Sequence, residues 1–252
     1  MNADYPTQAQ VTGLRKLWKE AFADTDAFLD AFFETAFSTR RCRCIVDGRE
    51  ILAALYWFEV RCAERRFAYL YAVATAEQYR GRGLFSVLLA DTKRILTAQG
   101  FDGILLVPEN DSLGRMYEKF GFFPCTTLRT RTAEAGEEPA DFQEIGPGEF
   151  ARLRRMLLPA GSILQEGADL ELLASQCRFW KGEKWLAVGR ISGQKLVCQE
   201  FLGDETAIPG LLRALDVSCG SFRMPGDGES FAYLLPLREN CLLPGYFALA
   251  LD

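Results

Sequence analysis

The residues with the clearest potential for chemistry lie in a glycine-rich loop, residues 78–83, which reads Gln-Tyr-Arg-Gly-Arg-Gly. A strand-like run over residues 69–75 precedes the loop, and an apolar-periodic helix follows it directly. The first N–H groups of a helix have no partner within the helix, and the helix dipole favours negative charge there. Gly81 and Gly83 let the backbone approach a phosphate where a Cβ would obstruct it. The loop therefore predicts a site for the phosphate groups of a cofactor.

A dinucleotide is one alternative for that cofactor. Residues 81–86 read G-x-G-x-x-S, close to the dinucleotide fingerprint, and Asp102 lies roughly where a ribose-binding acid would fall. Three observations count against it. Ser86 replaces the third small residue, Asp102 precedes the next strand instead of ending it, and the chain upstream offers antiparallel hairpins. A nicotinamide-dependent oxidoreductase therefore stays an alternative only.

Two motifs at the right separation resemble the GNAT superfamily of acyl-CoA-dependent N-acetyltransferases. Residues 78–83 resemble that family's acyl-CoA pyrophosphate loop, in which Gln or Arg is followed by two residues, Gly, one residue, and Gly or Ala. Asn110 is followed seven residues later by Tyr117, which resembles the second signature, an Asn at a strand end and a tyrosine on the next helix. The resemblance covers residues 5–130. The whole chain also resembles bacterial relatives of the Eis type, in which a second acetyltransferase-like fold follows the first.

The resemblance implies acetyl-CoA as the cofactor and a primary amine of a small molecule as the acceptor. It implies that the main chain of Val73 and Thr75 pairs with the pantetheine arm, as an added strand would. It also implies that a backbone N–H near Val73 stabilises the oxyanion, and that Asn110 bonds the cofactor amide. The predicted cofactor-binding residues are Val73, Ala74, Thr75, Gln78, Arg80, Gly81, Arg82, Gly83, Leu84, Phe85, Ser86 and Asn110.

The candidate catalytic residues are Tyr117 and Glu59. A phenol with a pKa of about 10 can protonate a thiolate with a pKa of about 8.5 only if its own pKa is lowered or the transfer is concerted. Tyr117 is the candidate acid under either condition, although its helical spacing also fits a core tyrosine. Glu59, on a neighbouring strand, is the candidate base, with Glu34 and a water chain to bulk solvent as alternatives.

Asp26, Asp30 and Glu34 recur every four residues and form an acidic stripe on a predicted helix. In the resembled fold this helix borders the acceptor cleft, so the stripe favours a cationic acceptor. A solvated helix face is the alternative interpretation. A non-catalytic module that binds or senses acyl-CoA is the alternative function from another class.

Composition excludes several functions. The 252 residues include no histidine, which excludes every imidazole-dependent scheme, and no C-x-x-C pair, so we expect no metal site. The net charge of −5 argues against a nucleic-acid partner. The longest apolar run, residues 51–58, is too short for a bilayer, and the first ten residues lack a signal-peptide pattern. We expect a cytoplasmic protein with no membrane partner, and leave self-association as a homo-oligomer open.

The elements that position these residues predict an α/β (α+β) fold with a central mixed, mostly antiparallel sheet flanked by helices. Residues 1–132 form the predicted catalytic domain, and residues 132–140 resemble a linker. Residues 140–252 form a second, smaller domain, a degenerate repeat whose segment 203–208 lacks the paired glycines. The elements predicted in this second domain are a helix over 170–180, strands over 185–190 and 195–202, a helix over 209–215, and strands near 222 and over 231–237.

Overall fold

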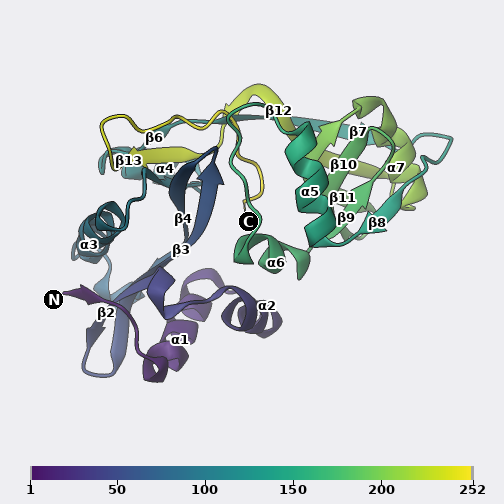
Figure 1. Ribbon diagram of the computed structural model, residues 1–252. Helices are drawn as coiled ribbons and strands as arrows, with labels where there is room; N and C mark the ends of the chain where they lie inside the picture. Colours follow the sequence, from purple (N-terminus) through teal and green to yellow (C-terminus); the bar gives the residue numbers. More distant parts are fainter. Residues whose placement is uncertain (1, 251–252) are drawn as a thin grey trace.

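The computed structural model describes residues 2–250 and contains two lobes, each built on one sheet with helices packed against it (Figure 1). The first sheet has seven strands in the order β1-β2-β3-β4-β5-β13-β6, and the second has six in the order β7-β12-β11-β10-β9-β8. The β4–β5 and β11–β12 pairs are parallel, and the neighbouring strand pairs are antiparallel. Two mixed, mostly antiparallel sheets confirm the predicted fold class.

The elements have the following bounds. The strands of the first sheet are β1 (Ala3–Asp4), β2 (Cys42–Asp47), β3 (Glu50–Cys62), β4 (Arg65–Thr75), β5 (Gly103–Leu106), β6 (Phe123–Pro124) and β13 (Tyr233–Pro236). The helices of the first lobe are α1 (Val11–Phe22), α2 (Asp26–Ala31), the π-helix η2 (Phe32–Ala36), α3 (Leu84–Ala98) and α4 (Asp111–Glu118), with 3-10 turns η1 (Gln8–Gln10), η3 (Thr39–Arg41) and η4 (Glu77–Tyr79). The second lobe contains β7 (Thr127–Glu134), β8 (Gln143–Ile145), α5 (Pro147–Leu157), α6 (Ala168–Ala174), β9 (Arg178–Lys181), β10 (Trp185–Ser192), β11 (Lys195–Gly203), η5 (Glu205–Ala207), α7 (Ile208–Ala214) and β12 (Cys219–Ser230).

Helices cover both faces of the first sheet, so β3 is buried on both sides. Successive side chains of a strand point to opposite faces. Tyr56 accordingly packs against Trp18 and Phe32 on the α1–α2 face, with a Trp18–Tyr56 ring separation of 5.0 Å. Its neighbour Trp57 lies in the cluster on the α3 face, which includes Leu88. The sheet is therefore a rigid support for the loop that joins β4 to α3.

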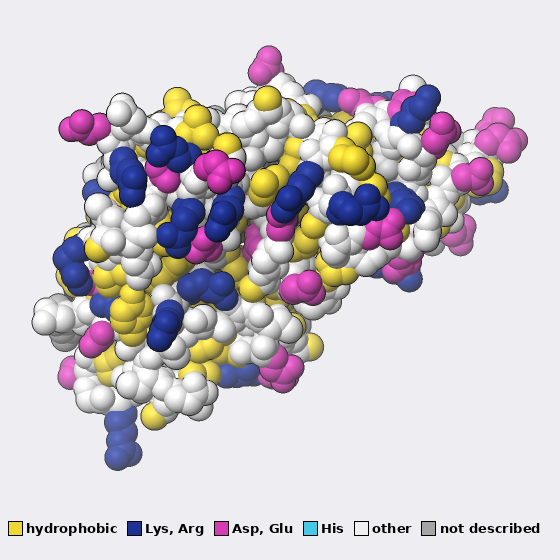
Figure 2. All heavy atoms as spheres, viewed as in Figure 1, with side chains coloured by type: hydrophobic (Ala, Val, Ile, Leu, Met, Phe, Trp, Pro, Cys, Tyr) yellow, Lys and Arg dark blue, Asp and Glu magenta, His cyan; other side chains and the backbone are white. Residues whose placement is uncertain are grey.

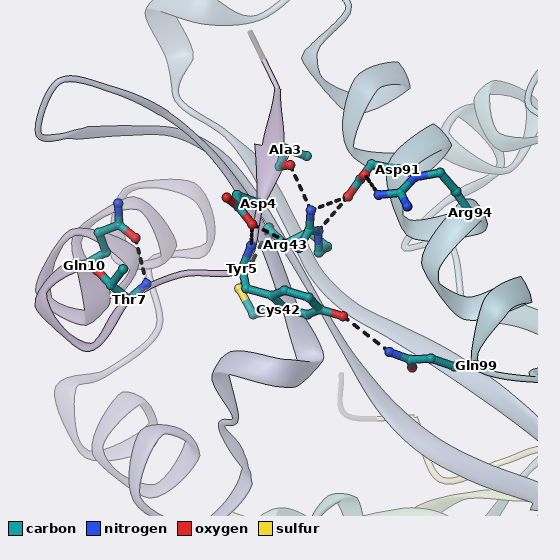
Figure 3. Close-up of polar contacts among 10 residues, drawn as sticks. All are labelled: Ala3, Asp4, Tyr5, Thr7, Gln10, Cys42, Arg43, Asp91, Arg94 and Gln99. Atoms are coloured by element: carbon teal, nitrogen blue, oxygen red, sulfur yellow. Dashed lines mark hydrogen bonds and ion pairs between the residues drawn. The ribbon is translucent and has the colours of Figure 1, made fainter.

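A buried arginine ties α3 to the sheet (Figure 3). Arg43 on β2 has a side chain only 4% exposed, and its Nε donates to Asp91 Oδ2 of α3 at 2.7 Å. Its Nη2 donates to the Ala3 carbonyl at 2.8 Å, and the Tyr5 ring lies against its guanidinium. These contacts satisfy a cation that burial would otherwise penalise. They also fix the orientation of α3, whose first turn follows the predicted loop.

The second lobe repeats part of the first. The order β9-β10-β11-η5-α7-β12 matches β2-β3-β4-η4-α3-β5. In each copy the strand before the helix carries a bulge: Ala72 and Val73 of β4 stand opposite one residue of β3, and Gln199 of β11 is an extra residue against β10. Each of these strands pairs in parallel with the next strand over only a few residues, and this pairing precedes the bulge. This repetition supports a repeated architecture across the chain.

The two lobes exchange strands. β13, near the end of the chain, lies in the first sheet between β5 and β6, and it pairs antiparallel with β5. Two residues after the end of β6 the chain enters β7, which pairs antiparallel with β12 in the second sheet. The predicted boundary at residues 132–140 therefore does not follow the sheets, and residues 132–134 of the predicted linker belong to β7. Hydrogen bonds to distant strands carry no local sequence signal.

Two elements of the second lobe differ from the prediction. The helix expected over residues 170–180 ends at Ala174, and residues 178–181 form β9 instead. No Gly or Pro marks that stop, so only pairing with β10 decides it. The helix α5 was not predicted at all. One of its buried positions is Arg154, and this charged residue interrupts the apolar period.

The lobes are in direct contact. Arg61 at the end of β3 and Leu164 exchange backbone hydrogen bonds of 3.3 and 2.6 Å. The Phe247 ring, from the last segment of the chain, packs against Tyr69 of β4 at 4.9 Å. Within residues 2–250, no helix combines the length and the apolar character that crossing a membrane would need.

Candidate active site

The predicted phosphate-binding loop leads into the first turn of α3. Gly81 and Gly83 have φ angles of 74° and 76°, in a backbone region that residues other than glycine rarely adopt. Gly83 is the N-cap residue, and no side chain caps the helix. A Cβ built on either glycine would meet no heavy atom within 4 Å, so this side of the loop is open. The N–H groups at the start of α3 are therefore arranged to receive an anion.

Contacts within the first lobe hold the side chains of the loop. Gln78 Nε2 donates to Glu50 Oε1 at 2.9 Å. Arg80 Nε donates to the Thr75 carbonyl at 3.3 Å, which fixes the loop to the end of β4. The Arg82 guanidinium lies 5.1 Å from the centre of the Tyr79 ring, a cation–π distance. The two arginines place positive charge on both sides of Gly81.

The pairing of β4 with β5 ends before the loop. These strands pair only through residues 67–69 and 103–105, and then separate. Past Tyr69, no β4 residue pairs with β5 among the residues that the structure describes. The β4 bulge lies within this stretch, where Ala72 has a φ of 48°. An extended arm could therefore pair with the main chain of Val73 to Thr75, as predicted for pantetheine.

Tyr117 on α4 packs near the loop through aromatic contacts. Its ring centre lies 5.7 Å from Phe85, in the first turn of α3, and 5.6 Å from Phe122. Burial raises the pKa of Tyr117 to about 12. This shift is opposite to the lowering that a stepwise proton donor would need. The phenol therefore stays protonated at neutral pH and can give its proton only in a concerted step.

Asn110 is the N-cap of α4. Its Oδ1 accepts a hydrogen bond from the Leu113 N–H at 3.0 Å. The side chain thus satisfies one of the unpaired donors at the helix start. Its predicted bond to the cofactor amide would use the amide nitrogen, and that bond stays a prediction.

Glu59 lies on β3 opposite Ala68, before the strands separate. Its carboxylate accepts two bonds from Arg66, at 2.9 and 2.8 Å, and this pairing lowers the pKa of Glu59. The Arg66 guanidinium in turn stacks over Phe101, which lies between α3 and β5. The carboxylate is therefore held by an arginine, and its lowered pKa makes it a weaker base than a free glutamate.

Replacing Glu59 by glutamine should lower kcat by less than about threefold, because we expect Glu59 not to be the general base. Removing a general base would lower kcat by about 100-fold or more. The glutamine keeps one acceptor for Arg66 and loses the charge. Steady-state rates with acetyl-CoA and a screened amine would measure the effect. A loss of about 100-fold with unchanged thermal stability would restore Glu59 as the base.

The predicted acidic stripe is largely neutralised. Asp26 forms an ion pair with Lys19 at 2.6 Å, and Asp30 pairs with Arg15. The hydrogen bond from Lys19 lowers the pKa of Asp26. On the face drawn in Figure 2, Lys and Arg side chains are likewise interspersed with Asp and Glu over both lobes. The solvated-face interpretation therefore fits the stripe better than a cation site.

Residues from the end of the chain pack on the α1–α2 face of β4, which local sequence reasoning could not locate. Phe247 packs on Tyr69 at 4.9 Å and on Phe231 at 6.0 Å. Tyr69 is the last β4 residue that pairs with β5, so this aromatic group lies where that pairing ends.

The second lobe fills its corresponding loop with its own side chains. Glu205 forms ion pairs with Arg129 and Arg131 of β7. Asp204 caps the turn, since its Oδ1 accepts from the Thr206 N–H at 3.0 Å. A carboxylate held by two arginines occupies the segment where the first lobe is open. The second copy therefore offers no equivalent place for a phosphate.

Comparison with known families agrees with this geometry. Residues 2–125 match a family model described as an acetyltransferase (GNAT) domain. Residues 2–125 of the chain therefore form a domain of the GNAT superfamily of acetyltransferases. Acetyl-CoA is the acetyl donor of this superfamily and hence the cofactor for this chain. No curated protein matches the sequence. The mostly antiparallel first sheet and this family match together argue against a dinucleotide-binding fold, and so against a nicotinamide-dependent oxidoreductase.

Solved structures resemble both lobes together. A GCN5-related N-acetyltransferase from Kribbella flavida aligns with a TM-score of 0.70 and 16% identity, over 92% of this chain and 70% of that one. One from Anabaena variabilis aligns with a TM-score of 0.72 and 12% identity, over 94% and 73%. Eis1 from Mycobacterium abscessus aligns with a TM-score of 0.69 and 12% identity, over 94% and 74%. At these identities the comparison establishes the shared two-lobe fold.

Proposed function

We propose that the protein transfers the acetyl group of acetyl-CoA to a primary amine of a small acceptor. The observation that carries this proposal is the uncapped start of α3, with Gly81 and Gly83 in the left-handed region, next to a bulged β4 that has separated from β5. The loop binds the diphosphate through N–H groups and the helix dipole. The free edge of β4 binds the pantetheine arm.

The bulge and Tyr117 supply the polar groups for the reaction. A backbone N–H at Val73 polarises the thioester carbonyl and stabilises the charge that develops on its oxygen. The amine nitrogen forms the new C–N bond, and the C–S bond breaks. Tyr117 donates its proton to the sulfur as that bond breaks, because a phenol with a pKa of about 12 would transfer it poorly to a free thiolate. The proton lost by the amine passes to water, since Arg66 holds Glu59.

The acceptor side favours an amine that can lie against aromatic rings. Phe33, Phe37 and Tyr71 are half-buried members of the cluster on the α1–α2 face. Aromatic faces attract ammonium groups, so a cationic acceptor can bind here without a free carboxylate. The amine must still lose a proton before attack. We therefore propose a small acceptor that combines a primary amine with an apolar body.

Replacing Tyr117 by phenylalanine should lower kcat by about 100-fold and leave the Kd for CoA within about threefold. The ring contacts with Phe85 and Phe122 survive the change, so the fold is kept. Tyr5→Phe is the matched control, because it removes a phenol that is packed on Arg43 away from the loop. Since the pKa of Tyr117 is raised to about 12, its ionisation should cause no loss of activity below about pH 10.

A non-catalytic acyl-CoA-binding module is the second candidate. The raised pKa of Tyr117 and the engaged carboxylate of Glu59 are the observations that favour it. The two candidates differ in the release of CoA thiol with a panel of amines. Release that depends on an amine and on Tyr117 supports the transferase. Tight acetyl-CoA binding with no release from any amine supports the binding module.

A further inference from the structure

Glu50, the first residue of β3, contacts the loop at two points. Its Oε1 accepts from Gln78 Nε2 at 2.9 Å, and its Oε2 accepts from the Tyr79 hydroxyl at 3.1 Å. Both partners lie in η4, which Arg80 joins to Gly81. The side-chain amide of the motif glutamine is thus bound by the β2–β3 hairpin. One carboxylate therefore anchors two consecutive residues of the phosphate-binding loop to the sheet.

The anchor extends to an arginine. The Tyr79 ring, held at its hydroxyl by Glu50, presents its face to the Arg82 guanidinium at 5.1 Å. Arg82 stands between Gly81 and Gly83, where the backbone has wide conformational freedom. A ring fixed at one end restricts an arginine that the glycines alone would leave mobile. The contacts run from Glu50 through Tyr79 to Arg82, at the start of α3.

We propose that Glu50 is a positioning residue for acyl-CoA, which holds the loop and, through Tyr79, directs Arg82 toward the phosphate groups. This inference rests on the proposed function. Glu50 carries a negative charge beside a site for an anionic cofactor, so charge alone predicts that its removal would strengthen binding. Positioning predicts the reverse. The sign of the change in affinity therefore separates the two explanations.

The test compares Glu50→Ala with Glu20→Ala in the full-length protein. Both residues line one surface pocket of about 300 Å³ and carry the same charge, but Glu20 pairs with Lys16 on α1 and is not bonded to the loop. Calorimetric titration with acetyl-CoA should show affinity weakened about fivefold to tenfold for Glu50→Ala, the loss expected for bonds to a charged group at an exposed site. Glu20→Ala should bind as tightly as the natural protein, or more tightly. For Glu50→Ala, kcat at saturating acetyl-CoA should stay within twofold of the value for the unsubstituted protein.

Two further readouts identify the route through Tyr79. Adding Tyr79→Phe to Glu50→Ala should cost nothing more, because both changes break the same contact. The dependence of affinity on salt should also weaken in Glu50→Ala, as Arg82 is no longer held near the phosphates. Equal or tighter acetyl-CoA binding by Glu50→Ala would overturn the inference. If the unsubstituted protein bound no acetyl-CoA, the proposed function itself would be overturned.

Discussion

Replacing Gly83 by aspartate should abolish acetyl-CoA binding, with a rise in Kd of about 100-fold or more and little change in Tm. Asp is among the few side chains that tolerate the left-handed region, and nothing lies within 4 Å of the new Cβ. The fold therefore accepts the change. The carboxylate would stand at the helix start where the diphosphate binds, and two like charges about 4 Å apart repel by about 4 kcal/mol at an effective dielectric of about 20. Isothermal titration and thermal melting measure the two quantities.

Two matched variants isolate the cause. Gly83→Asn has nearly the same size and the same tolerance of positive φ without the charge, so it should weaken binding much less than Gly83→Asp. Gly193→Asp places the same residue at a φ of 58° in the β10–β11 hairpin, also in open space, and should leave binding unchanged. If Gly83→Asp bound acetyl-CoA normally, the loop would not be the phosphate site.

Replacing Arg154 by methionine should destabilise the second lobe more than any surface change. Arg154 of α5 and Glu200 of β11 are 1% and 0% exposed, and their side chains form two bonds of 2.6 and 2.8 Å. Arg154 also donates to the Ile163 carbonyl at 3.2 Å. Removing one partner leaves a buried charge without compensation, which costs about 3–5 kcal/mol. The expected fall in Tm is about 6–20 °C.

The neighbouring residue provides the control for that prediction. Arg155 pairs with Glu166 at the surface, where its side chain is 61% exposed. Arg155→Met should therefore cost about 1 kcal/mol or less. The double variant Arg154→Met, Glu200→Leu should recover most of the lost stability, because neither member of the buried ion pair is then left without its partner. A shift of less than about 2 °C for Arg154→Met alone would show that water reaches Glu200.

The sequence predicted the parts of the site that are local in the chain. Residues 78–83 and the helix after them needed only a glycine pattern and an apolar period, and the structure places both as expected. The Glu59–Arg66 pair depends on the register of the β3–β4 hairpin, which no short motif specifies. The same limit applies to β13 and Phe247, which approach β4 and β5 from more than 100 residues away in the chain. The raised pKa of Tyr117 follows from burial, which only packing determines.

We expect the loop of the first lobe, and not that of the second, to hold the diphosphate of acetyl-CoA. Amide NMR spectra recorded while CoA is added would test this most directly. We predict that the largest shifts occur at the N–H groups of residues 81–86 and near Val73, with little change over residues 203–208. Shifts confined to other residues, or none at saturating CoA, would contradict the assignment of the cofactor site to this loop.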